Sequence, residues 1–154
     1  MTHVTERITV NRPCRVVYDQ WTQFEQFPRF MESVDRVIQV DERTLDWTAT
    51  IAGRIKHWRA EIVRQEPDRV IAWRTVDGAR NDGMVSFTSL DDATTEVTLD
   101  LDVEPDGPIE EIGGAIGVLA LSARRDMERF KAFIESRRAP TGAWRGNVES
   151  PSAR

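Results

Sequence analysis

The sequence is poor in the residues from which catalytic and metal sites are usually built. Its 154 residues include one cysteine, two histidines and one tyrosine. His3, His57 and Cys14 do not supply a cluster of typical metal ligands, so we expect no metal and no cofactor. The chain also lacks a GxSxG turn, a glycine-rich phosphate loop after a strand and a Cys/His pair. The sequence therefore indicates no catalytic residue.

The chain also has neither a cysteine pair nor a long apolar run. Because Cys14 is the only cysteine, no intrachain disulfide can form, and we expect a buried, unreactive thiol in a reduced, cytoplasmic compartment. Residues 1–7 are polar and lack the apolar core of a secretory signal. The longest stretch without charge, 112–123, is 12 residues long with three glycines. A bilayer span needs ~20 residues, so we expect no membrane span.

Charge of neither sign is concentrated along the chain. The 21 basic and 26 acidic residues give a formal net charge of -5 and form no long blocks. Nucleic acids and acidic membranes are bound by clustered Lys and Arg, so we expect neither as a partner. Hydrophobic residues make up 40% of the chain, with five Trp and six Phe, which is enough for one domain with a real core.

The N-terminal part of the chain predicts a strand and two short helices. Residues 6–11 alternate and predict a strand that Pro13 stops. Apolar residues at helical spacing then predict a short amphipathic helix over 13–22. Aromatic residues continue this spacing across Pro28, which should break the helix, so a second short helix is expected there.

From residue 34 the apolar period changes to two, and turn signals recur at short intervals. These signals delimit six strands, at residues 34–40, 44–51, 55–65, 69–76, 83–90 and 94–104. Connections this short force neighbouring strands to pair antiparallel. Alternation gives the strands one dry face, on which we place Trp47, Trp58, Ile71 and Trp73.

The opposite face of these strands is expected to be solvated and without chemistry. Alternation places His57 and Arg59 on it, and Glu61 and Arg74 are expected to form a cross-strand ion pair there. Such pairs typically contribute about 0.2–1 kcal/mol. Tyr18, beside Val17 and Trp21, is expected to be a partly buried structural residue rather than an acid.

The C-terminal part predicts one long helix and a tail. Apolar residues at steps of three and four predict a helix over 109–137, roughly 43 Å long at 1.5 Å per residue. Residues 139–154 are rich in Pro, Gly and Ser, so we expect a flexible tail after a ligand-binding domain over 1–138. Docking of Trp144 on its own domain or on a second subunit is the alternative.

This order of elements implies an interior cavity. A single helix about 10 Å wide cannot cover a seven-stranded sheet, so the sheet must curl around it. The predicted α+β fold is a seven-stranded curved antiparallel sheet wrapped around a long C-terminal helix, with two short helices between strands one and two. The residues expected to close or line the cavity are Trp21, Phe24, Phe27, Phe30, Trp47, Trp58, Trp73, Phe87, Gly113, Ile116 and Gly117. The same aromatic residues would also serve as ordinary core.

Three segments carry a resemblance to a known family. The segment VVYDQWTQFEQFPRFMESVDRV, the strand DRVIAWRT and the helix ERFKAFIES together resemble the polyketide cyclase/dehydrase and lipid-transport superfamily (SRPBCC). The resemblance covers about residues 6–138, and TGAWRG resembles the tails of bacterial proteins of this kind. It implies a START-like helix-grip fold with a hydrophobic-ligand cavity. The family includes aromatase/cyclases, quinone-binding chaperones and lipid carriers, so the resemblance does not select one function.

Three functions are compatible with these observations. The first is binding or carriage of a small hydrophobic molecule, such as a lipid, a quinone or a polyketide-like aromatic, because the aromatic interior shows no proton-transfer residues. The second, suggested by the resemblance alone, is a polyketide cyclase or dehydrase, which would need an inward-facing Arg, Tyr, His or carboxylate. The third is a structural or interaction protein with a side-chain-filled interior, whose tail or outer sheet face forms a homodimer.

Overall fold

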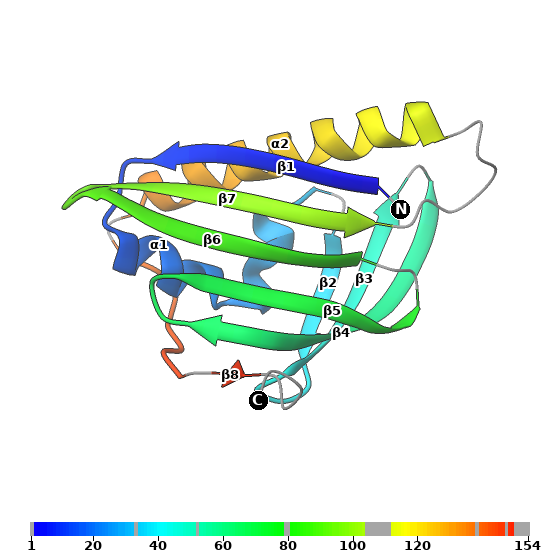
Figure 1. The fold of residues 1–154 in the computed structure, drawn as a ribbon, viewed down its shortest axis with the longest axis horizontal. Coiled ribbons are helices and arrows are strands. Elements are labelled where there is room, and N and C mark those ends of the chain that lie inside the picture. The colour runs from blue at the N-terminus through cyan, green and yellow to red at the C-terminus, as the bar shows by residue number, and fades with distance from the viewer. Residues whose placement is uncertain are drawn as a thin grey trace.

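The computed structural model describes residues 2–32, 34–51, 53–78, 81–103, 112–137, 139–146 and 148–149, with the backbone alone for 2, 51, 54, 103, 112–122 and 149. Its main feature is a curled antiparallel sheet in the order β1-β7-β6-β5-β4-β3-β2 (Figure 1). The strands are β1 (Thr2–Val10), β2 (Val34–Gln39), β3 (Thr44–Ile51), β4 (Arg54–Glu66), β5 (Val70–Gly78), β6 (Asn81–Asp91) and β7 (Thr94–Val103). A two-residue strand, β8 (Val148–Glu149), pairs with β4.

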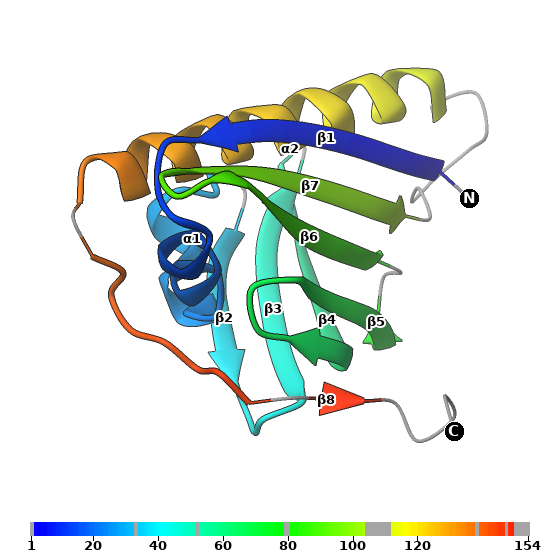
Figure 2. The same cartoon turned by 60° about the vertical axis from the view of Figure 1, so that its left-hand side comes forward.

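The helices are α1 (Cys14–Trp21), the 3-10 helix η1 (Phe24–Arg29) and α2 (Ile112–Glu135). Figure 2 shows the curled sheet with α2 along β1 and the short helix α1 at one end of the sheet. This arrangement confirms the predicted α+β helix-grip fold. Among the described residues, no helix combines the length and the apolar character that a bilayer span requires.

The short helices form as predicted, in two pieces. The carbonyl of Pro13 accepts hydrogen bonds from the amides of Val16 and Val17, which starts α1. After Thr22 the chain turns and continues as η1, which contains Pro28. The tighter 3-10 winding accommodates a proline that would interrupt an α-helix.

The first strand begins earlier than predicted. Thr2 to Val10 all pair with β7, whereas alternation suggests a start near residue 6. Three of the four added residues, Thr2, His3 and Thr5, are polar, whereas Val4 is buried in the core. The hydroxyl of Thr5 donates to Asp100 Oδ1 at 2.7 Å, and the His3 ring lies 2.7 Å from Asp102 Oδ1. The sequence signal for this part of the strand is weak, because Glu6 interrupts the apolar alternation between Val4 and Ile8.

The inner face of β4 and β5 follows the prediction with one irregularity. Trp58, Ala60 and Ile62 are buried, and so is Ile71. Val70, the first residue of β5, is buried as well, so two adjacent residues at the start of this strand depart from strict alternation. The register between β4 and β5 shifts twice further along, between Arg59 and Ala60 and between Ile62 and Arg64.

The outer face carries charge, as predicted. His57 and Arg59 are exposed. Arg59 binds Asp46 through two nitrogens, at 2.6 and 3.0 Å. Arg74 lies 3.9 Å from Glu61 in the neighbouring strand, which confirms the expected pair.

The described second half of α2 is amphipathic. Ala123, Met127, Phe130 and Ile134 are buried at steps of four, three and four residues. Figures 1 and 2 show α2 running alongside β1, the edge strand. The helix therefore covers the sheet with one apolar stripe, and its charged residues point outward.

The described residues after α2 also lie against the domain. Trp144 packs on the hydrophobic core, and Val148 is buried where β8 pairs with Gln65 of β4. The sequence predicts a flexible tail from residue 139, and that division of the chain stays a prediction. The sequence of this segment does not predict these contacts, because the residues that it contacts are far away in the chain.

Candidate functional site

Aromatic side chains from α1 and η1 form a sealed cluster. Trp21, Phe24, Phe27 and Phe30 are each at most 4% exposed. Their rings pack edge to face or tilted, with Trp21 5.7 Å, Phe24 5.4 Å and Phe30 5.5 Å from Phe27. These four residues, which we call the aromatic seal, close one end of the inner side of the sheet. Their packing resembles that of an ordinary hydrophobic core.

Phe87 on β6 and Phe130 on α2 join the aromatic seal. Phe87 lies 5.3 Å from the ring of Tyr18 and 6.2 Å from that of Trp21. Phe130 lies 4.7 Å from Trp21, so the sheet, α1 and α2 all meet at this tryptophan.

Three further tryptophans form a wall beside the seal. Trp47 on β3 and Trp58 on β4 are directly paired across the strands, and their rings stack at 5.6 Å with an angle of 7° between the planes. Trp73 on β5 packs against this pair. Trp47 and Trp73 are only partly buried, unlike the rings of the seal. Phe27 lies 5.7 Å from Trp47 and connects the seal to the tryptophan wall.

Gly83 makes room for one ring of the wall. A Cβ atom at this position would lie 2.5 Å from Cζ2 of Trp73 and 2.8 Å from the carbonyl oxygen of Asp100. Only glycine therefore lets the Trp73 ring approach β6 this closely. The predicted strand over 83–90 begins at this glycine, and a glycine in a strand can mark such a close approach.

The wall holds one buried polar atom without a hydrogen-bond partner among the described residues, Trp47 Nε1. A buried donor without a partner typically costs about 1–3 kcal/mol. The wall is therefore largely apolar, with one unused donor.

The ionisable side chains near the interior are held protonated or paired. Burial raises the pKa of Tyr18, and it also raises the pKa of the half-buried Cys14 thiol. Tyr18 is fully buried rather than partly buried as predicted. Asp19, the buried carboxylate of α1, binds Arg145. Among the described residues, no group of three potential ligands is placed to hold a metal ion.

Three of the predicted site residues lie where side chains are not described. Gly113, Ile116 and Gly117 are in the first half of α2. The other eight predicted residues fall into two groups that the sequence did not separate. Trp21, Phe24, Phe27, Phe30 and Phe87 belong to the sealed cluster, and Trp47, Trp58 and Trp73 form the wall.

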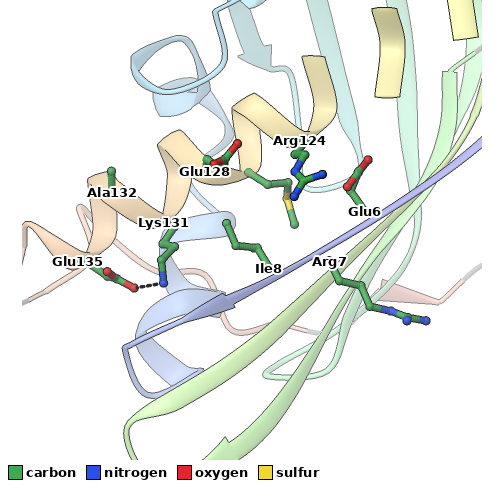
Figure 3. A pocket seen from close by; sticks show the side chains of 9 residues that line it. Glu6, Arg7, Ile8, Arg124, Glu128, Lys131, Ala132 and Glu135 are labelled. Carbon is green, nitrogen blue, oxygen red and sulfur yellow. Dashed lines mark hydrogen bonds and ion pairs between the residues drawn. The ribbon is translucent and has the colours of Figure 1, made fainter. Parts of the chain in front are cut away.

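A groove of about 460 Å³ lies elsewhere, between β1 and the second half of α2 (Figure 3). Its lining includes the apolar residues Ile8 and Met127 together with charged residues of both signs. Lys131 donates to Glu135 at 2.9 Å and to the carbonyl of Thr9 at 2.6 Å. The sequence did not predict this groove. Its charged lining differs from the apolar interior expected for a site that binds a hydrophobic ligand.

The chain matches a known family over most of its length. The family described as polyketide cyclase/dehydrase and lipid transport matches residues 10–132. An uncharacterised 17.2 kDa protein of Streptomyces lincolnensis is 44% identical over 149 residues, which is 96% of this chain and 99% of the relative.

Solved structures share the fold at low sequence identity. A START superfamily protein from Mycobacterium smegmatis is 14% identical with a TM-score of 0.78, covering 87% of this chain and 97% of that one. The Zhui aromatase/cyclase from Streptomyces sp. R1128 is 20% identical with a TM-score of 0.75, covering 93% and 99%. With the sequence match over residues 10–132, the conclusion is that the chain belongs to the polyketide cyclase/dehydrase and lipid-transport family.

Proposed function

We propose that this protein binds or carries a small hydrophobic molecule, such as a lipid, a quinone or a polyketide-like aromatic, against the tryptophan wall. The observation that carries the proposal is the difference between the two aromatic groups. The rings of the seal are covered, whereas Trp47 and Trp73 keep part of their surface free on the inner side of the sheet. Large apolar rings with free surface in a concave setting are typical of ligand sites.

The chemistry of the wall favours a flat or flexible apolar ligand. The stacked pair of Trp47 and Trp58 offers ring faces, on which another ring or an acyl chain packs well. The seal would close the site at one end, and Gly113, Ile116 and Gly117 of α2 would leave room opposite the wall. The last three assignments rest on the sequence.

A cyclase or dehydrase role receives less support from the described residues. Such chemistry needs a group that moves protons beside the substrate. The buried ionisable side chains that the structure describes include Tyr18 and Asp19, and these lie on α1, against Phe87 and Arg145. Neither belongs to the tryptophan wall.

Native mass spectrometry of gently purified protein tests the proposal. We expect a co-purified apolar species, or binding of a member of a panel of fatty acids, quinones and flavonoids. Trp47→Leu should weaken binding at least tenfold, because it removes half of the stacked pair and one of the two partly free rings. Leu90→Ser, at an exposed position on β6, is the matched control and should bind like the wild type. No bound species and no response to the panel would favour an interior filled by side chains.

Two further expectations concern the protein's setting. We infer a cytoplasmic location from the single cysteine, Cys14, because a chain that can form no intrachain disulfide suits a reduced compartment. A homodimer through the outer sheet face or the C-terminal segment is the associated prediction. Light scattering on purified protein would distinguish a dimer from a monomer.

A further inference from the structure

Residues 141–146, the TGAWRG segment, form a strap across the end of α1. The amide of Thr141 donates to Gln20 Oε1 at 2.8 Å, and Gln20 Nε2 donates back to the Thr141 hydroxyl at 3.0 Å. The amide of Trp144 donates to the hydroxyl of Thr22 at 3.1 Å. Figure 2 shows the segment running from the end of α2 past α1 to β8. The strap is therefore bonded to the last turn of α1.

A partly buried ion cluster fixes the strap at a second point. Arg145 donates to Asp19 on α1 at 2.5 Å and to Asp68 in the β4–β5 turn at 2.7 Å. Its guanidinium also lies over the Tyr18 ring, 5.6 Å from the centroid. Asp19 is only 6% exposed, so Arg145 is the partner that allows its charge to stay buried. One side chain thus ties α1 to the sheet.

Close packing completes the strap. A Cβ atom at Gly142 would lie 2.6 Å from the amide oxygen of Gln23, and one at Gly146 would lie 2.5 Å from the Trp144 ring. Val148, just beyond the strap, is 3% exposed and pairs with Gln65. The approach at Gly142 places the strap against the Gln23 side chain, and the approach at Gly146 is a contact within the strap.

The strap contacts converge on the joint between the two short helices. Asp19, Gln20, Thr22 and Gln23 are all bonded to it or packed against it. The same joint carries Trp21, at the centre of the aromatic seal. The seal can therefore move away from the sheet only if the contacts between the strap and this joint break.

We propose that residues 141–146 act as a clasp that keeps the aromatic seal closed, and that release of the clasp opens this end of the domain to ligand. The proposed opening of the seal does not depend on a bound ligand. The statement about ligand access rests on the proposed binding at the tryptophan wall.

Amide hydrogen exchange of the ligand-free protein tests the clasp. Arg145→Met leaves Asp19 buried without a partner and risks unfolding, so the main variant is Asp19→Asn/Arg145→Met, which removes both charges. Arg15→Met is the matched control, because Arg15 also lies beside Asp19, at 3.8 Å, but is exposed. We expect exchange in residues 16–30 to rise at least tenfold in the double variant, with β6 and β7 unchanged. No rise, or an equal rise in β6 and β7, would overturn the proposal.

A second readout concerns access. Anilinonaphthalene sulfonate, a fluorescent probe, is first bound to the wild type and to the double variant. Its displacement by excess competitor is then followed in a stopped-flow instrument. We expect it to dissociate at least several-fold faster from the double variant, and an unchanged rate would overturn the role in access. The exchange experiment uses no ligand, so it tests the clasp even if the proposed binding at the tryptophan wall is wrong.

Discussion

Gly83 shows how one residue shapes the inner face of the sheet. Because Gly83 has no side chain, the Trp73 ring can occupy the space where a Cβ atom would lie. We predict that Gly83→Ala lowers the free energy of unfolding by about 1–3 kcal/mol, the usual range for overpacking. Urea unfolding would measure the change. In a Trp73→Leu background the loss should be smaller, and an equal loss in both backgrounds would show that the ring contact is not the cause.

Asp126 is the second residue with a measurable consequence. Burial raises its pKa to about 6, although the amide of Glu32 donates to Oδ1 at 3.3 Å and Arg129 lies 3.6 Å away. A carboxyl group whose pKa is raised on folding disfavours the folded state once it ionises. The loss of stability therefore develops as the pH rises from about 4 to about 6, and it is constant above that range.

We predict that Asp126→Asn is more stable than the wild type at pH 7.5, by about 1–3 kcal/mol, because the amide needs no buried charge. The difference should shrink as the pH falls towards 4. Thermal or urea unfolding over this pH range would measure it. Glu128→Gln, at an exposed position on the same helix, changes the net charge equally and should show no such trend. A difference that does not depend on pH would contradict the explanation.

At the scale of elements, α2 is held by its apolar stripe. Phe130 is fully buried between Trp21 and Phe30, whereas Phe133 is partly buried and lies beneath the guanidinium of Arg29. We predict that Phe130→Ala lowers the free energy of unfolding by about 3–5 kcal/mol. Phe133→Ala, three residues away, should have a clearly smaller effect. Chemical unfolding of both variants checks this, and equal losses would argue against a one-sided stripe.

The elements themselves could largely be predicted from the sequence. Turn signals and alternation located the strands, because each signal lies within a few residues of its consequence. The early start of β1 escaped, since the polar cross-strand contacts of His3 and Thr5 leave Val4 as its only apolar residue before Glu6. The strap escaped for a stronger reason: Arg145 acts on Asp19, which is 126 residues away.

At the scale of the whole molecule, the curled sheet divides its aromatic residues into a sealed end and a partly open wall. The sequence indicated which aromatic residues face inward. It could not separate the covered phenylalanines from the partly free tryptophans, because core packing and ligand contact call for the same residue types. The difference depends on where α1, η1 and α2 meet the sheet, and the proposed function depends on that difference.

The indole N–H resonances of the five tryptophans offer the most direct test of the proposed binding. They can be assigned with single Trp→Phe variants and then followed by NMR during a titration with 1,4-naphthoquinone, a flat apolar probe. We predict saturable shifts of the signals from Trp47, Trp58 and Trp73, and smaller changes for Trp21 in the seal. A titration in which the three wall signals do not move, while the probe stays in solution, would contradict binding at the tryptophan wall.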